Sequence, residues 1–186
     1  MRTEIEKSLE VLRRGGVLVY PTDTIWGIGC DATSEEAVTK IYKIKNRSES
    51  KSLVILVSDW DMLSEYVPEI PPAIKEFLNR VVKPTTVIYK EPRGLANNVV
   101  ASDNTVAIRL VQDQFCEELI GAYGKPIVST SANYSGAPSP LCFAEIDEEL
   151  LSKADYIVNL SRDENQNSAS QIVKFDEDGT INYIRK

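Results

Sequence analysis

The sequence predicts an α/β fold in which helices pack on a mixed sheet, and three observations carry this expectation. Segments with the apolar spacing of helices alternate with short apolar runs through most of the chain. The last stretches are extended and end in a hairpin, whose turn is marked by Asp178-Gly179. The length of 186 residues fits one domain whose core needs no disulfides. We therefore expect a single α/β domain over residues 1–186.

The first elements follow from apolar spacing and from helix start and stop signals. Apolar residues at helical spacing predict a helix over 3–14, which the two following glycines stop. The apolar run at 17–20 predicts a short strand. Thr33 with Glu36 resembles a capping box and predicts a second helix that runs to about residue 45.

The same reasoning places the remaining elements. Continuous apolar runs predict strands at 53–57, 85–89, 106–111 and 127–129. Helices are predicted near 60–67, at 72–82, where a proline pair suits the first turn, and at 113–123, before Gly124. Late strands are predicted at 155–160, 171–175 and 181–184. The polar stretch 161–169 is either a flap over a site or a disordered surface loop.

Composition limits the chemistry that the chain can perform. It contains no histidine, so the commonest general base and a common metal ligand are absent. The net charge of −7 argues against a dedicated nucleic-acid binder but allows a local basic groove. Three distant cysteines without a Cys-x-x-Cys pair indicate a reducing compartment. Since we find neither a membrane-spanning segment nor a signal peptide, we expect a cytoplasmic protein.

A cluster of cations stands out in this acidic chain. Lys43, Lys45, Arg47 and Lys51 lie at the end of the second predicted helix and just beyond it. Clustered cations can hold polyanions such as nucleotide phosphates. They can equally cap a helix C-terminus and remain solvated, and their position alone does not separate the two roles.

Polar residues also follow two apolar strands directly. Residues 21–29 contain hydroxyls and two glycines, which suits a plain turn or a close backbone approach to a ligand. The run from Ser129 to Asn133 follows another strand, where α/β proteins usually place ligand sites. Without histidine no Ser-His-Asp triad can form, so hydrogen bonding to a ligand is the favoured role of Ser131. Arg109 lies in an apolar strand and either extends to water or pairs with an anion.

Five segments in this order and spacing resemble the YrdC family. They are Pro21-Thr22-Asp23-Thr24 with Gly27 and Gly29, Lys45-Asn46-Arg47, Pro84-Thr85-Thr86, Val106-Ala107-Ile108-Arg109, and the run from Pro126 to Gly136. The resemblance spans about residues 5–160 and points to the single-domain branch of the family. It implies a twisted mixed sheet flanked by helices, with a concave basic groove.

The resemblance also implies an enzyme that transfers a nucleotidyl group. Family members join L-threonine, bicarbonate and ATP into threonylcarbamoyl-adenylate and release pyrophosphate. A separate threonylcarbamoyl transferase complex then modifies adenosine in certain tRNAs. The implied partners are therefore ATP, L-threonine, bicarbonate, that complex and, through a weak contact, tRNA. The implied cofactor is Mg²⁺, held mainly by the ATP phosphates and not by protein side chains.

Motif positions carry the implied roles of individual residues. Lys45 and Arg47 bind the ATP phosphates and are the catalytic pair. The residues that hold threonine are Thr22, Thr24, Arg109 and Ser131, with Arg109 on the carboxylate. The remaining nucleotide ligands are Thr105, Asn133 and Ser170.

Departures from the family pattern keep two alternatives open. Ser48 and Ser52 stand where the family often has proline, and Leu56 where many members have histidine. A nucleotide-binding paralogue of the same fold that lacks this reaction would fit those changes. The other alternative is an RNA-binding module that uses the same groove, which the net charge opposes.

Overall fold

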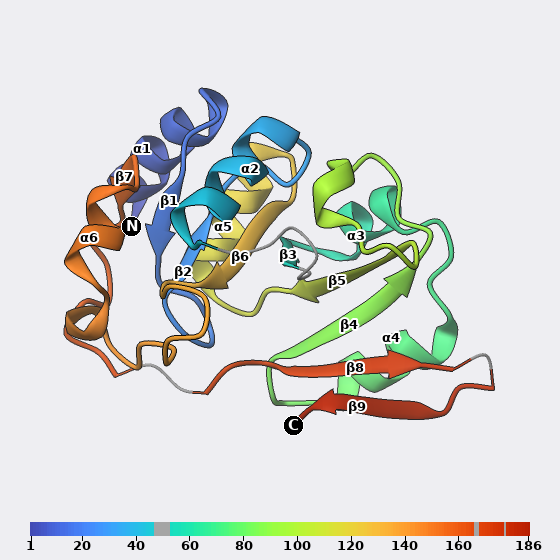
Figure 1. The fold of residues 1–186 in the computed structure, drawn as a ribbon. Coiled ribbons are helices and arrows are strands. Elements are labelled where there is room, and N and C mark those ends of the chain that lie inside the picture. The colour runs from blue at the N-terminus through green and yellow to red at the C-terminus, as the bar shows by residue number, and fades with distance from the viewer. Residues whose placement is uncertain (47–52, 166–167, 177) are drawn as a thin grey trace.

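The computed structural model describes residues 1–46, 53–165, 168–176 and 178–186, and in these ranges it forms one nine-stranded mixed sheet (Figure 1). The strands are β1 (Leu18–Tyr20), β2 (Gly27–Gly29), β3 (Val54–Val57), β4 (Thr85–Lys90), β5 (Thr105–Leu110), β6 (Ile127–Ser131), β7 (Tyr156–Ile157), β8 (Gln171–Phe175) and β9 (Ile181–Arg185). Their order across the sheet is β7-β1-β2-β6-β3-β5-β4-β8-β9. The predicted α/β fold with a mixed sheet is confirmed.

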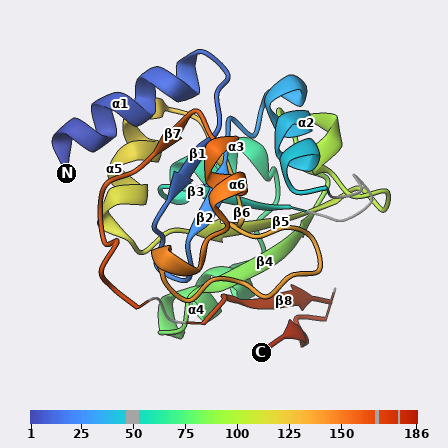
Figure 2. The same ribbon diagram turned by 60° about the vertical axis from the view of Figure 1, so that its left-hand side comes forward.

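Helices cover the sheet in the alternation that the sequence predicts. They are α1 (Arg2–Arg13), α2 (Glu35–Ile44), α3 (Trp60–Tyr66), α4 (Pro72–Arg80), α5 (Gln114–Tyr123) and α6 (Glu148–Ser152), with 3₁₀ turns η1 (Asn97–Val99) and η2 (Phe143–Glu145). α1 and α5 pack against each other, as Figure 2 shows. On the other half of the sheet, Phe77 of α4 meets the ring of Phe175 of β8 edge-on. None of the described helices is long and apolar enough to cross a membrane.

The strand pairing places β6, β3 and β5 at the centre of the sheet. β3 pairs in parallel with β5 and antiparallel with β6, so the apolar run at 54–57 is flanked on both sides. β5 continues into the antiparallel pair with β4, and β4 pairs in parallel with β8. β9 forms the outer edge of the sheet and pairs with β8.

β2 is a strand that sequence periodicity does not predict. Its three residues, Gly-Ile-Gly, have no alternation to recognise, yet Gly27 pairs with Tyr20 on one side and with Ser131 on the other. A Cβ at Gly29 would lie 1.8 Å from the carbonyl oxygen of Val128, so only glycine allows this approach. The strand is therefore made by tertiary pairing.

Two other local expectations need correction. The side chain that caps α2 is Ser34, which accepts from the backbone N–H of Ala37 at 3.3 Å, and not Thr33. The Thr33 hydroxyl instead donates a hydrogen bond to Oδ1 of Asp31 at 2.6 Å. The strand predicted at 155–160 is only Tyr156–Ile157, and α6 precedes it unpredicted because five helical residues give too short a pattern.

Candidate functional site

A cavity of about 220 Å³ opens on the middle of the sheet. Its lining comes from β2, β3, β5, β6, β8 and β9, from the loops that precede β2 and β8, and from the loop that follows β6. Of the residues expected from the sequence, it contains Thr24, Arg109, Ser131 and Ser170. A second cavity of about 290 Å³, lined by residues between 132 and 147, adjoins it at Ser139 and includes Asn133. The sheet thus gathers side chains that are far apart in the sequence.

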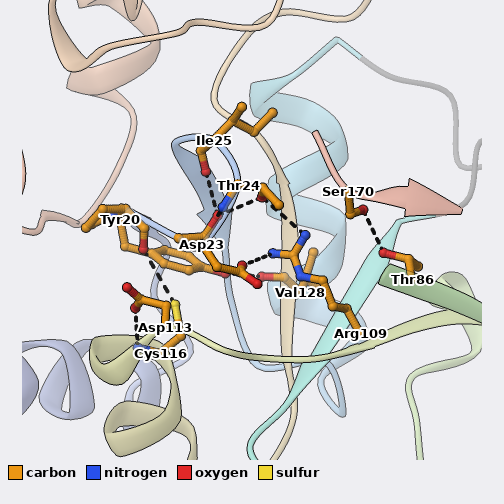
Figure 3. Close-up of polar contacts among 12 residues, drawn as sticks. Tyr20, Asp23, Thr24, Ile25, Thr86, Arg109, Asp113, Cys116, Val128 and Ser170 are labelled. Carbon is orange, nitrogen blue, oxygen red and sulfur yellow. Dashed lines mark hydrogen bonds and ion pairs between the residues drawn. The ribbon is translucent and has the colours of Figure 1, made fainter. Parts of the chain in front are cut away.

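Arg109 is the buried cation of the main cavity, and Figure 3 shows its guanidinium directed at the loop between β1 and β2. Its Nη1 donates to the hydroxyl of Thr24 at 3.2 Å. Its Nη2 lies 3.0 Å from Oδ1 of Asp23, and both side chains are less than a tenth exposed. The sequence left two roles open for Arg109, extension to water or pairing with an anion. The structure shows the second role.

Hydrogen bonds within the loop fix Thr24 beside Arg109. The hydroxyl of Thr22 donates to the carbonyl of Ile25 at 2.8 Å and accepts from the backbone N–H of Thr24 at 3.1 Å. The two threonine hydroxyls are 2.9 Å apart and share a further hydrogen bond. Thr22 therefore shapes the loop, whereas Thr24 lines the cavity.

Ser170 marks the opposite wall. Its hydroxyl lies 2.8 Å from that of Thr86 on β4 and 3.2 Å from Nη2 of Arg185 on β9. In Figure 3 the Ser170–Thr86 pair lies on the other side of Arg109 from Asp23. The cavity therefore carries hydroxyls on two walls with a guanidinium between them.

Arg185 is a cavity residue that the sequence reasoning missed. Its Nε donates to the Ser170 carbonyl at 2.9 Å, which holds the guanidinium in the cavity lining. Arg185 is exposed as a whole residue, but partial burial and the positive charge of Arg109, which lines the same cavity, both lower its pKa. The pairing of β8 with β9 brings Arg185 to the cavity. The sequence shows an arginine after Ile184 but does not show this pairing.

Lys45 is buried at the end of α2 and joins it to the end of β6. Its ammonium donates to the carbonyl of Ser131 and, at 2.6 Å, to that of Asn133. Its own carbonyl accepts from the N–H of Ser135 at 3.0 Å. Lys45 thus contacts the backbone of the segment that holds Ser131 and Asn133, and it is absent from the lining of either cavity. Arg47 lies outside the described residues, as do Ser48, Lys51 and Ser52.

Asn133 and Thr105 differ in how well they match the expectation. The Asn133 amide donates to the carbonyl of Ala137 at 2.6 Å, and its buried Oδ1 accepts no hydrogen bond from any described residue. That oxygen is a candidate ligand acceptor. Thr105 begins β5, donates to Asp103 at 2.6 Å and is absent from the lining of either cavity. It lies about 13 Å along the strand from Arg109.

Comparisons with known proteins agree with this fold. The family model named Sua5/YciO/YrdC, described as "Telomere recombination", matches residues 10–186. Threonylcarbamoyl-AMP synthase of Hahella chejuensis is 38% identical over 130 residues, covering 69% of this chain and 71% of that protein. The enzyme of the same name from Xanthomonas campestris pv. campestris is 31% identical over 160 residues, covering 84% and 85%.

A solved structure extends the comparison to three dimensions. The crystal structure of Sua5 from P. abyssi complexed with L-threonine superposes with a TM-score of 0.82 at 25% identity. The match covers 92% of this chain and 50% of that one. This chain therefore spans about half the length of that Sua5.

Proposed function

The chain belongs to the Sua5/YciO/YrdC family, and on this premise we propose that it makes threonylcarbamoyl-adenylate and pyrophosphate from L-threonine, bicarbonate and ATP. The product would serve the threonylcarbamoyl modification of tRNA, as in its relatives named threonylcarbamoyl-AMP synthase. The single observation that carries the proposal is the cavity in which Arg109, Thr24, Ser170 and Arg185 meet. Two guanidinium groups with hydroxyls suit an amino-acid carboxylate beside nucleotide phosphates.

The reaction requires two bond-forming steps. The α-amine of threonine attacks the carbon of bicarbonate, and loss of water leaves a carbamate. An oxygen of the carbamate then attacks the α-phosphorus of ATP, and the bond from that phosphorus to the pyrophosphate breaks. Such a displacement is accelerated mainly by positioning and by neutralising the charge of the leaving group. No side-chain nucleophile is needed.

The residues on each wall of the cavity would have a separate role in this reaction. Arg109 with Thr24 would hold the threonine carboxylate, because a planar guanidinium matches it in a fork. Arg185 and Ser170 would hold phosphate oxygens on the opposite wall. Lys45, with its ammonium on the carbonyls of Ser131 and Asn133, would fix the end of β6 and add positive charge near the phosphates.

Mg²⁺ fits this site as an ion carried by the nucleotide. Among the described residues, no group of three or more His, Cys, Asp or Glu side chains is placed to hold a metal. The ion would therefore be bound mainly by ATP phosphates and water, where it offsets charge on the phosphate oxygens. We further propose a nucleotidyltransferase that acts in the cytoplasm, hands its product to a threonylcarbamoyl transferase complex, and contacts tRNA weakly.

The direct test uses purified protein, ATP, Mg²⁺ and labelled bicarbonate with each amino acid in turn. We expect a labelled adenylate and pyrophosphate with threonine, and loss of both in Arg109→Lys at low threonine. ATP binding without any labelled product would instead favour the nucleotide-binding paralogue. Salt-sensitive RNA binding without ATP turnover would favour the RNA-binding alternative.

A further inference from the structure

Asp23 is a charged residue beside the cavity for which the proposed chemistry has no direct use. It lies in the loop between β1 and β2, between the two threonines, and its carboxylate faces the guanidinium of Arg109 at 3.0 Å (Figure 3). Both partners are buried, with side-chain exposures of 8% for Asp23 and 5% for Arg109. Asp23 does not itself line the cavity.

The surroundings of the Asp23 carboxylate disfavour its charged form. Burial raises the pKa of Asp23 and the charge of Asp113 adds to this, whereas the charge of Arg109 and backbone hydrogen bonds from Asp23 and Gln112 lower it in part. Neither oxygen of Asp23 accepts a well-aligned hydrogen bond from the described residues. An intact buried ion pair adds little net stability compared with an apolar pair, so we look for the role of Asp23 in its effect on Arg109.

Two contacts from one loop orient the Arg109 guanidinium. Asp23 lies at Nη2 and Thr24 at Nη1, so both ends of the planar group are held from the same side. Arg185 is a second guanidinium in the lining of the same cavity, and the positive charge of Arg109 lowers its pKa, so the two cations repel each other. Without the negative charge of Asp23, that repulsion would act on an arginine that, among the described residues, keeps a hydrogen bond to the neutral hydroxyl of Thr24.

We propose that Asp23 is a positioning residue that fixes the Arg109 guanidinium for a substrate carboxylate. The inference rests on the proposed function, because threonine is the carboxylate in question. Positioning and simple charge balance predict opposite results when Asp23 is neutralised. If Asp23 only competed for Arg109, its removal would strengthen carboxylate binding. If it orients Arg109, its removal weakens that binding.

The experiment compares threonine and ATP binding by calorimetry in the wild type and in Asp23→Asn. We expect threonine affinity to fall about 10- to 100-fold, the range of one charge-assisted contact, while ATP affinity changes less than about threefold. In steady state the KM for threonine should rise more than kcat falls. Unchanged or tighter threonine binding by folded Asp23→Asn would overturn the proposal.

Asp113→Asn is the matched control. It removes the same charge close to Asp23, and asparagine caps a helix about as well as aspartate, so α5 keeps its cap on the N–H of Cys116. We expect its threonine affinity to stay within about twofold of the wild type, because Asp113 has no contact with Arg109 among the described residues. An equal loss in both variants would point to general electrostatics and against positioning.

Two further measurements keep the test decisive. In an Arg109→Gln background, Asp23→Asn should weaken threonine binding no further, since Asp23 acts through Arg109. If Asp23→Asn does not fold, Asp23→Glu keeps the charge but shifts the carboxylate by one methylene, and wild-type threonine affinity there would overturn the proposal. Failure of the wild type to bind threonine would sink the proposed function itself, so the two failures are distinguishable.

Discussion

The ammonium of Lys45 donates to the carbonyl oxygen of Asn133 at 2.6 Å and thereby ties the end of α2 to the loop after β6. A second carbonyl, that of Ser131, accepts from the same ammonium. One buried cation therefore orders the segment in which the family motifs place a threonine ligand and a nucleotide ligand.

Removing the Lys45 ammonium should cost both stability and activity. Lys45→Met keeps the apolar stem but deletes two charge-assisted hydrogen bonds, so we expect a loss of about 2–4 kcal/mol in unfolding free energy. Synthase activity should fall as well, because Ser131 and Asn133 lose their anchor. Urea unfolding and pyrophosphate release measure the two effects. Lys43→Met, on the exposed face of the same helix, should change stability by less than about 0.5 kcal/mol.

The Asp23–Arg109 pair should respond unequally to loss of either partner. Asp23→Asn leaves a guanidinium that cannot lose its charge, so we expect a loss of about 3–5 kcal/mol. Arg109→Gln leaves a carboxyl whose pKa burial already raises, and this group can take up a proton and become neutral. The loss of unfolding free energy in Arg109→Gln should therefore be smaller, and urea unfolding of the two variants compares them.

The same pair predicts a pH dependence of known sign. A carboxyl with a raised pKa in the fold binds more protons folded than unfolded, so its contribution to stability falls as pH rises above its ordinary value of 3.8. Without Arg109 this pKa rises further. Arg109→Gln should accordingly lose little stability at about pH 5 and more at about pH 8, measured by urea unfolding. Equal losses at both values would contradict a titrating Asp23.

Asp31 should show the opposite sign. Burial opposes its ionisation, but hydrogen bonds from Thr33 and Tyr123 and the ammonium of Lys125 bring its pKa below the usual range. Its stabilisation is present above the ordinary pKa of 3.8 and is lost as pH falls through the lower folded value. Asp31→Asn should cost about 2–4 kcal/mol at pH 7 and less near pH 3. Urea unfolding at the two pH values measures the difference.

Gly29 should tolerate no side chain. The Cβ of Gly29→Ala would lie 1.8 Å from a backbone carbonyl of β6, so β2 and β6 would have to separate, at a cost of more than about 3 kcal/mol. Gly121→Ala in α5 is the control, because a Cβ there would approach no atom outside its own helix backbone within 4 Å. There we expect a gain of about 0.5–1 kcal/mol. Thermal unfolding of both variants checks the pair.

Sequence patterns predicted the elements that local physics determines and missed those that pairing creates. The amphipathic helix α1 and the cap at Gly124 follow from spacing and from a left-handed residue with φ +72°, so they were predictable. β2 exists only because β1 and β6 lie on both sides of it. Thr33 and Ser34 are adjacent hydroxyl residues, and a tertiary partner, Asp31, decided which of them caps α2.

The candidate site likewise contains residues that the sequence predicted and residues that only the tertiary structure reveals. Thr24, Arg109, Ser131 and Ser170 meet in one cavity, as family motifs led us to expect. The two charged neighbours of Arg109 were not recognised. Asp23 lies inside one of the family motifs but was given no role, because the sequence does not show which strand residue it faces. Arg185 reaches the cavity through the β8–β9 pairing, which joins residues remote from the motifs.

The last prediction is that turnover passes through no covalent enzyme intermediate. A nucleophilic cysteine needs a lowered pKa, yet burial raises the pKa of both Cys30 and Cys116, and the Cys116 thiol donates to the Pro21 carbonyl at 3.5 Å. Cys142 is the more accessible thiol and belongs to neither cavity lining. Cys142→Ser should therefore keep full pyrophosphate release, and Cys116→Ala should lose stability before it loses activity. Intact-mass spectrometry during turnover should show no adenylyl or acyl adduct. A stable adduct on Cys30 or Ser131 would replace direct displacement by a two-step covalent route.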